Sequence, residues 1–379
     1  MNKNQLLAFL VGLYAFIMLR PSFTWGVPGN LLLYFQIIPI AIFLPRLDLK
    51  KGGNGVYFAA FFALFLFICL LRGFNIQYSL FLLTFAFIPF VSKEFMAMCV
   101  DYFTKIYAVI IGISMVVAIL VVMGVPLGGQ IIPPLNELKD YNYISYPFLV
   151  IPTLTEFIRF HGPFDEPGVV GTVGFTLLVV NKYKLKNIWN ILILISCIIS
   201  FSFAFYAGTV IYLIVRFFTH REKSVGYLLL GAVVFYLVTS NIPVFHNIYS
   251  RFEYDESSGK LVGDDRTVEA QDAFFESIRG TSIYFWGTSS DDIREEMTGS
   301  AGYKKAIIQN GLVFMVLYCL MFWGFANHCK LRRDQLLILI ALMLINFYHR
   351  PNMLSFTYIL LYIGYIKLRA CENEGLIEA

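Results

Sequence analysis

Long runs of apolar residues, separated by short polar breaks, fill most of this 379-residue chain. Hydrophobic residues make up 58% of the sequence and charged residues 14%, whereas soluble domains carry roughly 25% charged residues. A soluble core cannot absorb this much apolar surface, so the lipid bilayer is the expected solvent. Backbone polar groups in lipid must bond within the chain, and the alternation of a membrane barrel is missing. We therefore expect an all-α polytopic membrane protein, with a single integral membrane domain over residues 1–379.

The apolar runs predict about twelve transmembrane helices, although several runs are shorter than the ~20 residues that usually cross the hydrocarbon. The fourth and eleventh runs, and the division between the seventh and eighth near residues 200–206, are the least well defined. We expect the spans at residues 6–19, 30–45, 56–71, 77–91, 104–125, 167–181, 187–201, 204–218, 225–241, 306–326, 335–348 and 352–368.

Lysine and arginine residues orient these helices. If the N-terminus is cytoplasmic, most short-loop Lys and Arg residues fall on the cytoplasmic side, and the short outer loops carry only Arg20, Arg72 and Arg350. This is the positive-inside bias of short loops. We therefore expect both termini in the cytoplasm and two long loops, residues 126–166 and 242–305, with short helices on the outer face. Only these loops have room for a site outside the membrane.

The second long loop has a pattern of its own. One face of residues 266–279 is apolar, which predicts an amphipathic helix. That face comprises Val268, Phe274, Phe275 and Ile278. Aromatic residues 284–286 suit the lipid headgroup boundary, and residues 291–297 predict a further short helix. The loop has a net negative charge, which argues against nucleic acid or another polyanion as a partner.

The first long loop ends in a dense polar segment, Arg159-Phe-His-Gly-Pro-Phe-Asp-Glu-Pro-Gly168. A basic residue, a histidine and two carboxylates lie beside glycines and prolines that shape the backbone. The chain contains no nucleotide-binding fingerprint, and its six cysteines are spaced for neither metal nor disulfides. We therefore expect no cofactor and no metal, and we look for chemistry in this segment.

This segment resembles the Arg-Phe-x-Gly-x-Phe-x-Glu-Pro-Gly element of Wzy-type polysaccharide repeat-unit polymerases, in the O-antigen polymerase and ligase superfamily. Weaker features agree: a Ser-containing stretch at 200–208, an arginine-helix-glycine pattern over 266–287, and Asn-Gly at 310–311. Ligases of the superfamily usually carry a His-Asn pair before the next span, whereas residues 300–306 contain no histidine. The resemblance therefore favours a polymerase over a ligase.

The resemblance implies a GT-C-like fold in a bacterial inner membrane, with the active site facing the periplasm. It implies transfer of a glycan from undecaprenyl pyrophosphate to the sugar of another lipid-linked repeat unit, in O-antigen, capsule or exopolysaccharide biosynthesis. The expected partners are undecaprenyl-pyrophosphate-linked oligosaccharides, the lipid bilayer and a chain-length regulator protein.

This chemistry assigns roles to the polar residues of the outer face. Arginine matches phosphate oxygens with a planar fork of donors, and a desolvated carboxylate suits the base that takes the acceptor proton. We expect Glu166, Asp165 and Arg159 to be catalytic. The expected substrate-binding residues are Arg251, Arg266, Arg279, Arg350, His349 and His161.

Other interpretations stay open. Arg159 can anchor its loop to Glu156 or to lipid headgroups, Glu166 can cap the following helix, and exposed arginines such as Arg279 are usually only solvated. An O-antigen ligase with the same donor and a lipid-linked oligosaccharide flippase or transporter are the alternative functions. A flippase should carry ionisable residues inside its spans, whereas here they gather at the span ends and outside.

Overall fold

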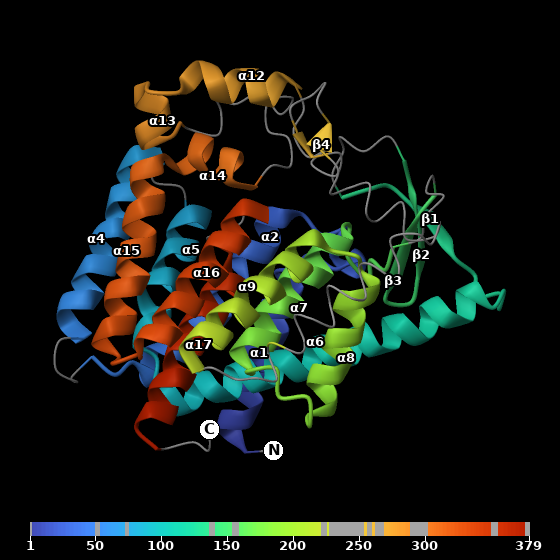
Figure 1. Cartoon of the computed structure of the whole chain (residues 1–379), viewed down its shortest axis with the longest axis horizontal. Coiled ribbons are helices and arrows are strands. Elements are labelled where there is room, and N and C mark those ends of the chain that lie inside the picture. Colours follow the sequence, from blue (N-terminus) through green and yellow to red (C-terminus); the bar gives the residue numbers. More distant parts are fainter. Residues whose placement is uncertain are drawn as a thin grey trace. The chain divides into compact units, whose positions relative to one another are not determined.

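The computed structural model describes residues 2–49, 54–72, 76–135, 141–153, 159–220, 226, 254–255, 260–261, 269–288, 302–349 and 355–375. These residues are mostly helical, as expected (Figure 1). The chain divides into two compact units, which we describe separately. The first unit comprises residues 1–206, 321–339 and 353–379, and the second comprises residues 207–320 and 340–352.

Most of the described helices lie close to the apolar runs of the sequence. They are α1 (Lys3–Ile17), α2 (Gly29–Tyr34), α3 (Ile37–Phe43), α4 (Asn54–Arg72), α5 (Ile76–Phe87), α6 (Lys93–Val122), α7 (Pro167–Val180), α8 (Ile188–Ile199), α9 (Phe203–His220), α15 (Leu312–His328), α16 (Arg333–His349) and α17 (Phe356–Asn373). The expected division near residues 200–206 falls between α8 and α9, where Phe201 has a positive φ of 48°. The expected span at 225–241 lies outside the described residues.

Helix α6 differs from its predicted span. It begins at Lys93 rather than near residue 104 and runs for 30 residues. Lys105 lies within the helix and pairs with Asp101 one turn earlier, at 2.6 Å. Among the described helices, α6 is the one that is long and apolar enough to cross a membrane as a straight segment. Helices α14 (Gly302–Asn310) and α15 meet this criterion only as a pair bent by 103°.

The predicted span at residues 30–45 is also interrupted, because it forms the two short helices α2 and α3. Pro39 has no N–H to donate to the carbonyl of residue 35, so the helical ladder weakens at this point. The amide of Gln36 is completely buried and donates from Nε2 to Thr84 Oγ1 of α5 at 2.8 Å. This buried hydrogen bond lies where the helix is interrupted between α2 and α3.

The described part of the first long loop contains a β-sheet, where short helices were expected, so the all-α prediction is wrong for this loop. Strands β1 (Gln130–Ile132), β2 (Tyr143–Tyr146) and β3 (Leu149–Pro152) form an antiparallel sheet in the order β1-β2-β3. Tyrosine and β-branched isoleucine and valine suit a half-buried pleated surface. Pro147 and Phe148 form the two-residue turn between β2 and β3, and Phe148 has a positive φ of 59°.

Helix α7 is the central helix of the first unit, and nearly all of its residues are buried. It packs against α8 and α17, while α6 packs against α1, α8 and α17. The glycines of α7 allow this close approach: a Cβ on Gly174 would lie 2.2 Å from Cys197 Sγ of α8, and one on Gly171 would lie 2.1 Å from Ser202 Cβ.

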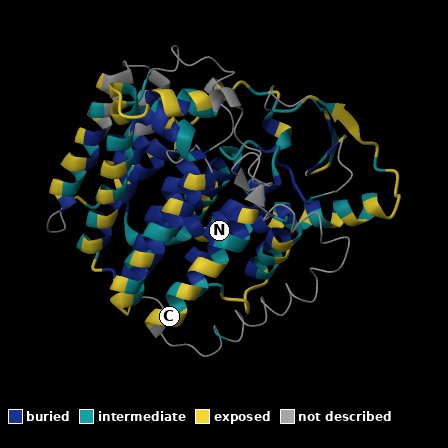
Figure 2. Ribbon diagram, turned by 45° about the horizontal axis from the view of Figure 1, so that its top comes forward, coloured by how far each residue is buried: buried dark blue, intermediate teal, exposed yellow. Residues whose placement is uncertain are grey.

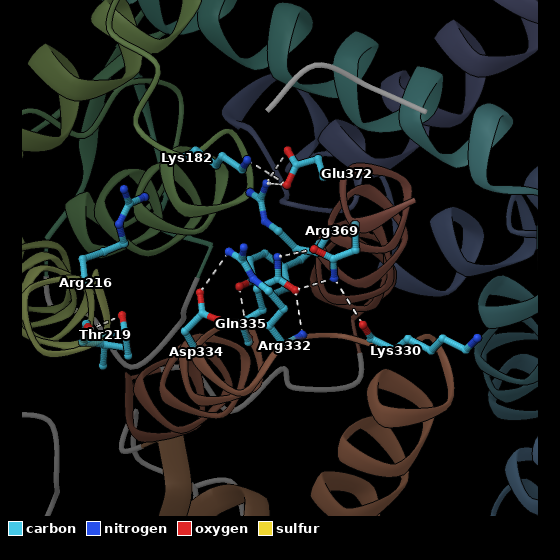
Figure 3. A network of polar contacts seen from close by, with 12 residues as sticks. Lys182, Arg216, Thr219, Lys330, Arg332, Asp334, Gln335, Arg369 and Glu372 are labelled. Atoms are coloured by element: carbon cyan, nitrogen blue, oxygen red, sulfur yellow. Dashed lines mark hydrogen bonds and ion pairs between the residues drawn. The ribbon is translucent and has the colours of Figure 1, made fainter. Parts of the chain in front are cut away.

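A polar network holds one end of the first unit together (Figure 3). Arg369 of α17 is almost fully buried and donates to the carbonyls of Val179 and Val180, where α7 ends. Glu372 accepts from both Arg369 and Lys182, at 2.8 Å each. A guanidinium at a helix C-terminus is favourable because the terminal carbonyls are unsatisfied and partly negative.

Further contacts bring the starts of α1 and α6 to this same end. Arg46 donates to Asn4 at the start of α1, and Lys93 at the start of α6 pairs with Glu374, just after α17. Both ends of the described chain therefore lie at this end of the unit (Figure 1), which we call the terminal end. The sheet β1-β2-β3 follows the opposite end of α6, and that opposite end carries the site described below.

Exposed residues recur on the outward faces of the helices (Figure 2), and many of them are large and apolar. Along α6, the exposed fractions are 58% for Val116, 59% for Ile119 and 76% for Val122. Leu320 and Trp323 of α15 are similarly exposed. Contiguous apolar patches of this kind are uncommon on soluble monomers and mark surfaces that meet lipid or another protein.

The second unit contains α12 (Glu269–Ile278), α13 (Ser282–Trp286), α14 and the two-residue strands β4 (Tyr254–Asp255) and β5 (Lys260–Leu261). The predicted amphipathic helix is confirmed as α12, whose Phe275 and Ile278 pack against Ile307 and Ile308 of α14. The short helix expected at residues 291–297 lies outside the described residues.

Two glycines lock α13 to the bend between α14 and α15. Gly287 and Gly311 both have a φ of 80°, and Thr288 N donates to Ile308 O at 3.0 Å. A Cβ on Gly311 would lie 2.4 Å from Phe285 O. Only glycine adopts this backbone at such a distance without displacement of its neighbours.

Candidate active site

Segment 159–166 lies at the end of the first unit that is opposite the terminal end. Backbone hydrogen bonds fix its position. The segment leads into α7, and hydrogen bonds from three other segments fix its path. These bonds are Phe160 N to Ile199 O at 3.3 Å, Val150 N to Gly162 O at 2.9 Å, and Ser22 N to Pro163 O at 2.6 Å. The end of α8, strand β3 and the loop after α1 therefore meet at this segment.

Local residue chemistry explains the sharp turn of the segment. Gly162 has a φ of 55°, and a Cβ there would lie 2.9 Å from Ile111 Cδ1. Phe164 N donates to His161 O, which closes the turn. The Phe164 ring is fully buried, stacked on Tyr107 and next to Phe16. Burying such a ring stabilises by roughly 1.5–3 kcal/mol, so Phe164 anchors the segment in the core.

Arg159 binds the C-terminal end of α8. Its Nε donates to Ser200 O at 3.2 Å and its Nη2 to Phe201 O at 2.9 Å. These carbonyls follow the last turn of α8, where a positive charge is favourable. The described contacts therefore give Arg159 a structural role, and the side chain remains half-exposed. Glu156, its proposed loop partner, lies outside the described residues.

His161 and Tyr143 belong to an aromatic group at the base of the site. The rings of Trp25 and Tyr141 are each centred 5.5 Å from the Tyr143 ring, and His161 is centred 6.0 Å from it. His161 is buried, and Tyr143 is completely buried. Burial, followed by the hydrogen bond with Tyr141 and the charge of Asp165, raises the pKa of Tyr143. The phenol therefore stays protonated and donates to Asp165 O at 2.6 Å.

The two carboxylates lie at the start of α7. Glu166 is the N-cap residue of this helix, Pro167 fills its first turn, and both Asp165 and Glu166 are half-exposed. The Glu166 side chain makes no capping hydrogen bond to α7, although Glu166 occupies the N-cap position that the sequence suggested. The helix N-terminus still favours negative charge at these positions. A carboxylate in this position can accept a proton from an incoming hydroxyl.

The structure does not bring all the predicted site residues into this segment. Arg279 and His349 belong to the second unit. Arg279 is exposed and pairs with Glu276 at 3.0 Å, whereas His349 is buried at the end of α16 with its ring 5.0 Å from Tyr348. The remaining predicted ligands, Arg251, Arg266 and Arg350, lie outside the described residues.

Three residues of this region were not predicted as site residues: Arg20, Trp25 and Tyr143. Arg20 stood out in the sequence as an outer-loop arginine, but nothing in the spacing linked residues 20–25 to residues 159–166. The described part of the chain contains no group of three or more His, Cys, Asp or Glu residues that could hold a metal ion. The chemistry available here is therefore that of carboxylates, arginines, a histidine and aromatic rings.

We compared the chain with known protein families, curated proteins and solved structures. No protein-family model, no curated protein and no solved structure matches this chain.

Proposed function

We propose that this protein is a membrane glycosyltransferase that polymerises lipid-linked oligosaccharide repeat units. The observation that carries the proposal is the polar segment 159–168, which resembles the repeat-unit polymerase element and is built into a defined turn beside two carboxylates. The apolar outer faces of the helices support a bilayer environment. We propose twelve spans, cytoplasmic termini and a periplasmic site. The position of this turn in the first unit, opposite both termini, supports the placement of the site and the termini on opposite faces.

The reaction transfers one glycan between two lipid carriers. The acceptor hydroxyl oxygen bonds to the anomeric carbon of the donor sugar, and the bond from that carbon to the diphosphate oxygen breaks. Glu166 or Asp165 takes the hydroxyl proton, and undecaprenyl pyrophosphate leaves with the bonding electron pair. Stabilisation of the charge on the leaving diphosphate is the largest catalytic contribution expected. Arginines of the outer face supply it, because their planar donors match phosphate oxygens.

Arg159 contributes to this chemistry in one of two ways. Its guanidinium either contacts the diphosphate directly, or it fixes the end of α8 so that the segment keeps its turn. The contacts with Ser200 O and Phe201 O support the second role. A lysine keeps the charge but cannot donate to both carbonyls as the guanidinium does. If Arg159 only fixes the end of α8, Arg159→Lys should lower activity and stability together. If Arg159 contacts the diphosphate, Arg159→Lys should lower activity without a matching loss of stability.

Deletion of the gene tests the proposed function. A polymerase deletion should leave single repeat units on the cell's final lipid acceptor, because a separate ligase remains. Polymer stranded on undecaprenyl pyrophosphate would instead identify a ligase, and unpolymerised units trapped in the cytoplasm would identify a flippase. The measurement is electrophoresis of the surface glycan together with mass analysis of the lipid-linked pool. Complementation with the wild-type chain is the control, and long polymer in the deletion strain would refute the proposal.

A further inference from the structure

Arg20 lies beside the candidate active site, although it is far from it in sequence. It follows α1 and has a φ of 58°. Two residues later, Ser22 N donates to Pro163 O, and the Trp25 ring packs against Tyr143. The Trp25 indole donates from Nε1 to Arg20 O at 2.9 Å, which fixes the backbone of Arg20. The loop that carries Arg20 is therefore part of the wall around segment 159–166.

The guanidinium of Arg20 has few partners for its degree of burial. It is half-buried, and within the described residues its hydrogen bond is a single one, from Nη1 to Val27 O at 3.0 Å. A guanidinium has five N–H donors, so most of its capacity is unused. No carboxylate of the described residues pairs with it, whereas Arg279 pairs with Glu276 and Arg369 with Glu372.

A half-buried charge without a counter-ion is unfavourable unless something else neutralises it. Burial lowers the pKa of Arg20, in agreement with this cost, but an arginine stays charged at neutral pH. The sequence carries an independent sign, because Arg20 is one of the few short-loop cations on the expected outer face. Charge, location and unused donors all fit an anionic ligand at the outer membrane surface.

We propose that Arg20 binds a phosphate group of the lipid-linked diphosphate donor. This assignment rests on the proposed function and adds a ligand residue to it from a part of the chain remote from the polar segment. Phosphate suits the planar donor fork of arginine. The same phosphate chemistry occurs in ordinary anionic phospholipids, so the test must separate a donor site from a headgroup anchor.

The experiment measures binding of undecaprenyl diphosphate to the full chain in phosphatidylcholine nanodiscs. Arg20→Gln should raise the Kd by about 10- to 100-fold, on the scale of one or two charge-assisted hydrogen bonds. Arg20→Lys keeps the charge but loses the fork, so its Kd should rise by about 3- to 10-fold. Arg332→Gln is the matched control, because it removes an exposed arginine that is already paired with Asp334, and its Kd should not change.

Several outcomes would overturn the assignment. One is an unchanged Kd in a folded Arg20→Gln protein, and another is no measurable binding by the wild type. If the glutamine variant does not fold, the lysine variant decides by the same criterion. Wild-type binding that phosphatidylglycerol in the nanodisc abolishes would indicate a headgroup anchor instead. The measurement needs no polymer, so a failed deletion test would refute the polymerase and leave this result standing.

Discussion

Replacement of Gly311 by alanine should destabilise the second unit more than any ordinary surface change. A side chain at a φ of 80° costs about 1–2 kcal/mol, because the left-handed region crowds the Cβ. The new Cβ would also lie 2.4 Å from Phe285 O, and relief of such a contact costs roughly 1–3 kcal/mol more. We expect a total loss of about 2–5 kcal/mol in the free energy of unfolding.

The chain offers a matched control in the same unit. Gly280 has a φ of 77°, but a Cβ there would meet nothing within 4 Å. Gly280→Ala therefore isolates the backbone cost and should lose only about 1–2 kcal/mol. Denaturant unfolding in mixed micelles, followed by circular dichroism, measures both variants against the wild type. The difference between them reports the clash with the backbone of α13.

Equal losses for the two alanine variants would refute the reasoning, because the close approach of Gly311 to α13 would then contribute nothing. A loss below about 1 kcal/mol in both would also exclude the positive φ as a constraint. Gly287→Ala tests the cost of the backbone clash a second time, since its Cβ would lie 2.7 Å from Gln309 O. It should resemble Gly311→Ala rather than Gly280→Ala.

Four further predictions concern the candidate site and the topology. Arg159→Lys should shorten the polymer, at a cost of roughly 1–3 kcal/mol in transition-state stabilisation, and full-length polymer at normal protein level would contradict this. Glu166→Gln should shorten the polymer, because the amide keeps the shape of the side chain but removes the basic carboxylate; unchanged glycan ladders would leave it a structural residue. Tyr143→Phe should cost about 1 kcal/mol. The pKa of Tyr143 is raised in the folded state, so the stability that its phenol contributes is complete below about pH 10 and is lost above it. The Tyr143→Phe protein should therefore be less sensitive to alkaline unfolding than the wild type, as scanning calorimetry would detect. Cysteines placed at Gly129 and Lys260 should react with an impermeant reagent in intact cells, and labelling only after lysis would reverse the topology.

The sequence predicted the helices well where hydrophobicity alone decides. Helix α7 begins and ends within a residue of its predicted span, because Pro167 sets its start and a continuous apolar run follows. Hydrophobicity did not locate the break at Gln36, which Pro39 and the contact with Thr84 favour, or the break at Gly311, which depends on the contact with α13. The sheet of the first loop was missed because its strands are only three or four residues long.

The candidate site was predictable in part for similar reasons. Segment 159–166 could be found because its polar residues are dense and local. The contribution of Arg20 could not, because the contact of Ser22 with Pro163 joins positions that are remote in the chain. Nor could the sequence tell that Arg159 binds the carbonyls that follow α8, since backbone acceptors leave no trace in residue spacing.

The network at the terminal end has a consequence for biogenesis. Arg369 closes the end of α7 from a position 189 residues later, and Thr357 of α17 donates to Ala15 O across 342 residues. The ribosome releases α1 and α7 long before α17 exists. Until then the carbonyls that end α7 lack their guanidinium and the groove for α17 is open. The first unit therefore completes its packing only after the intervening second unit has been synthesised.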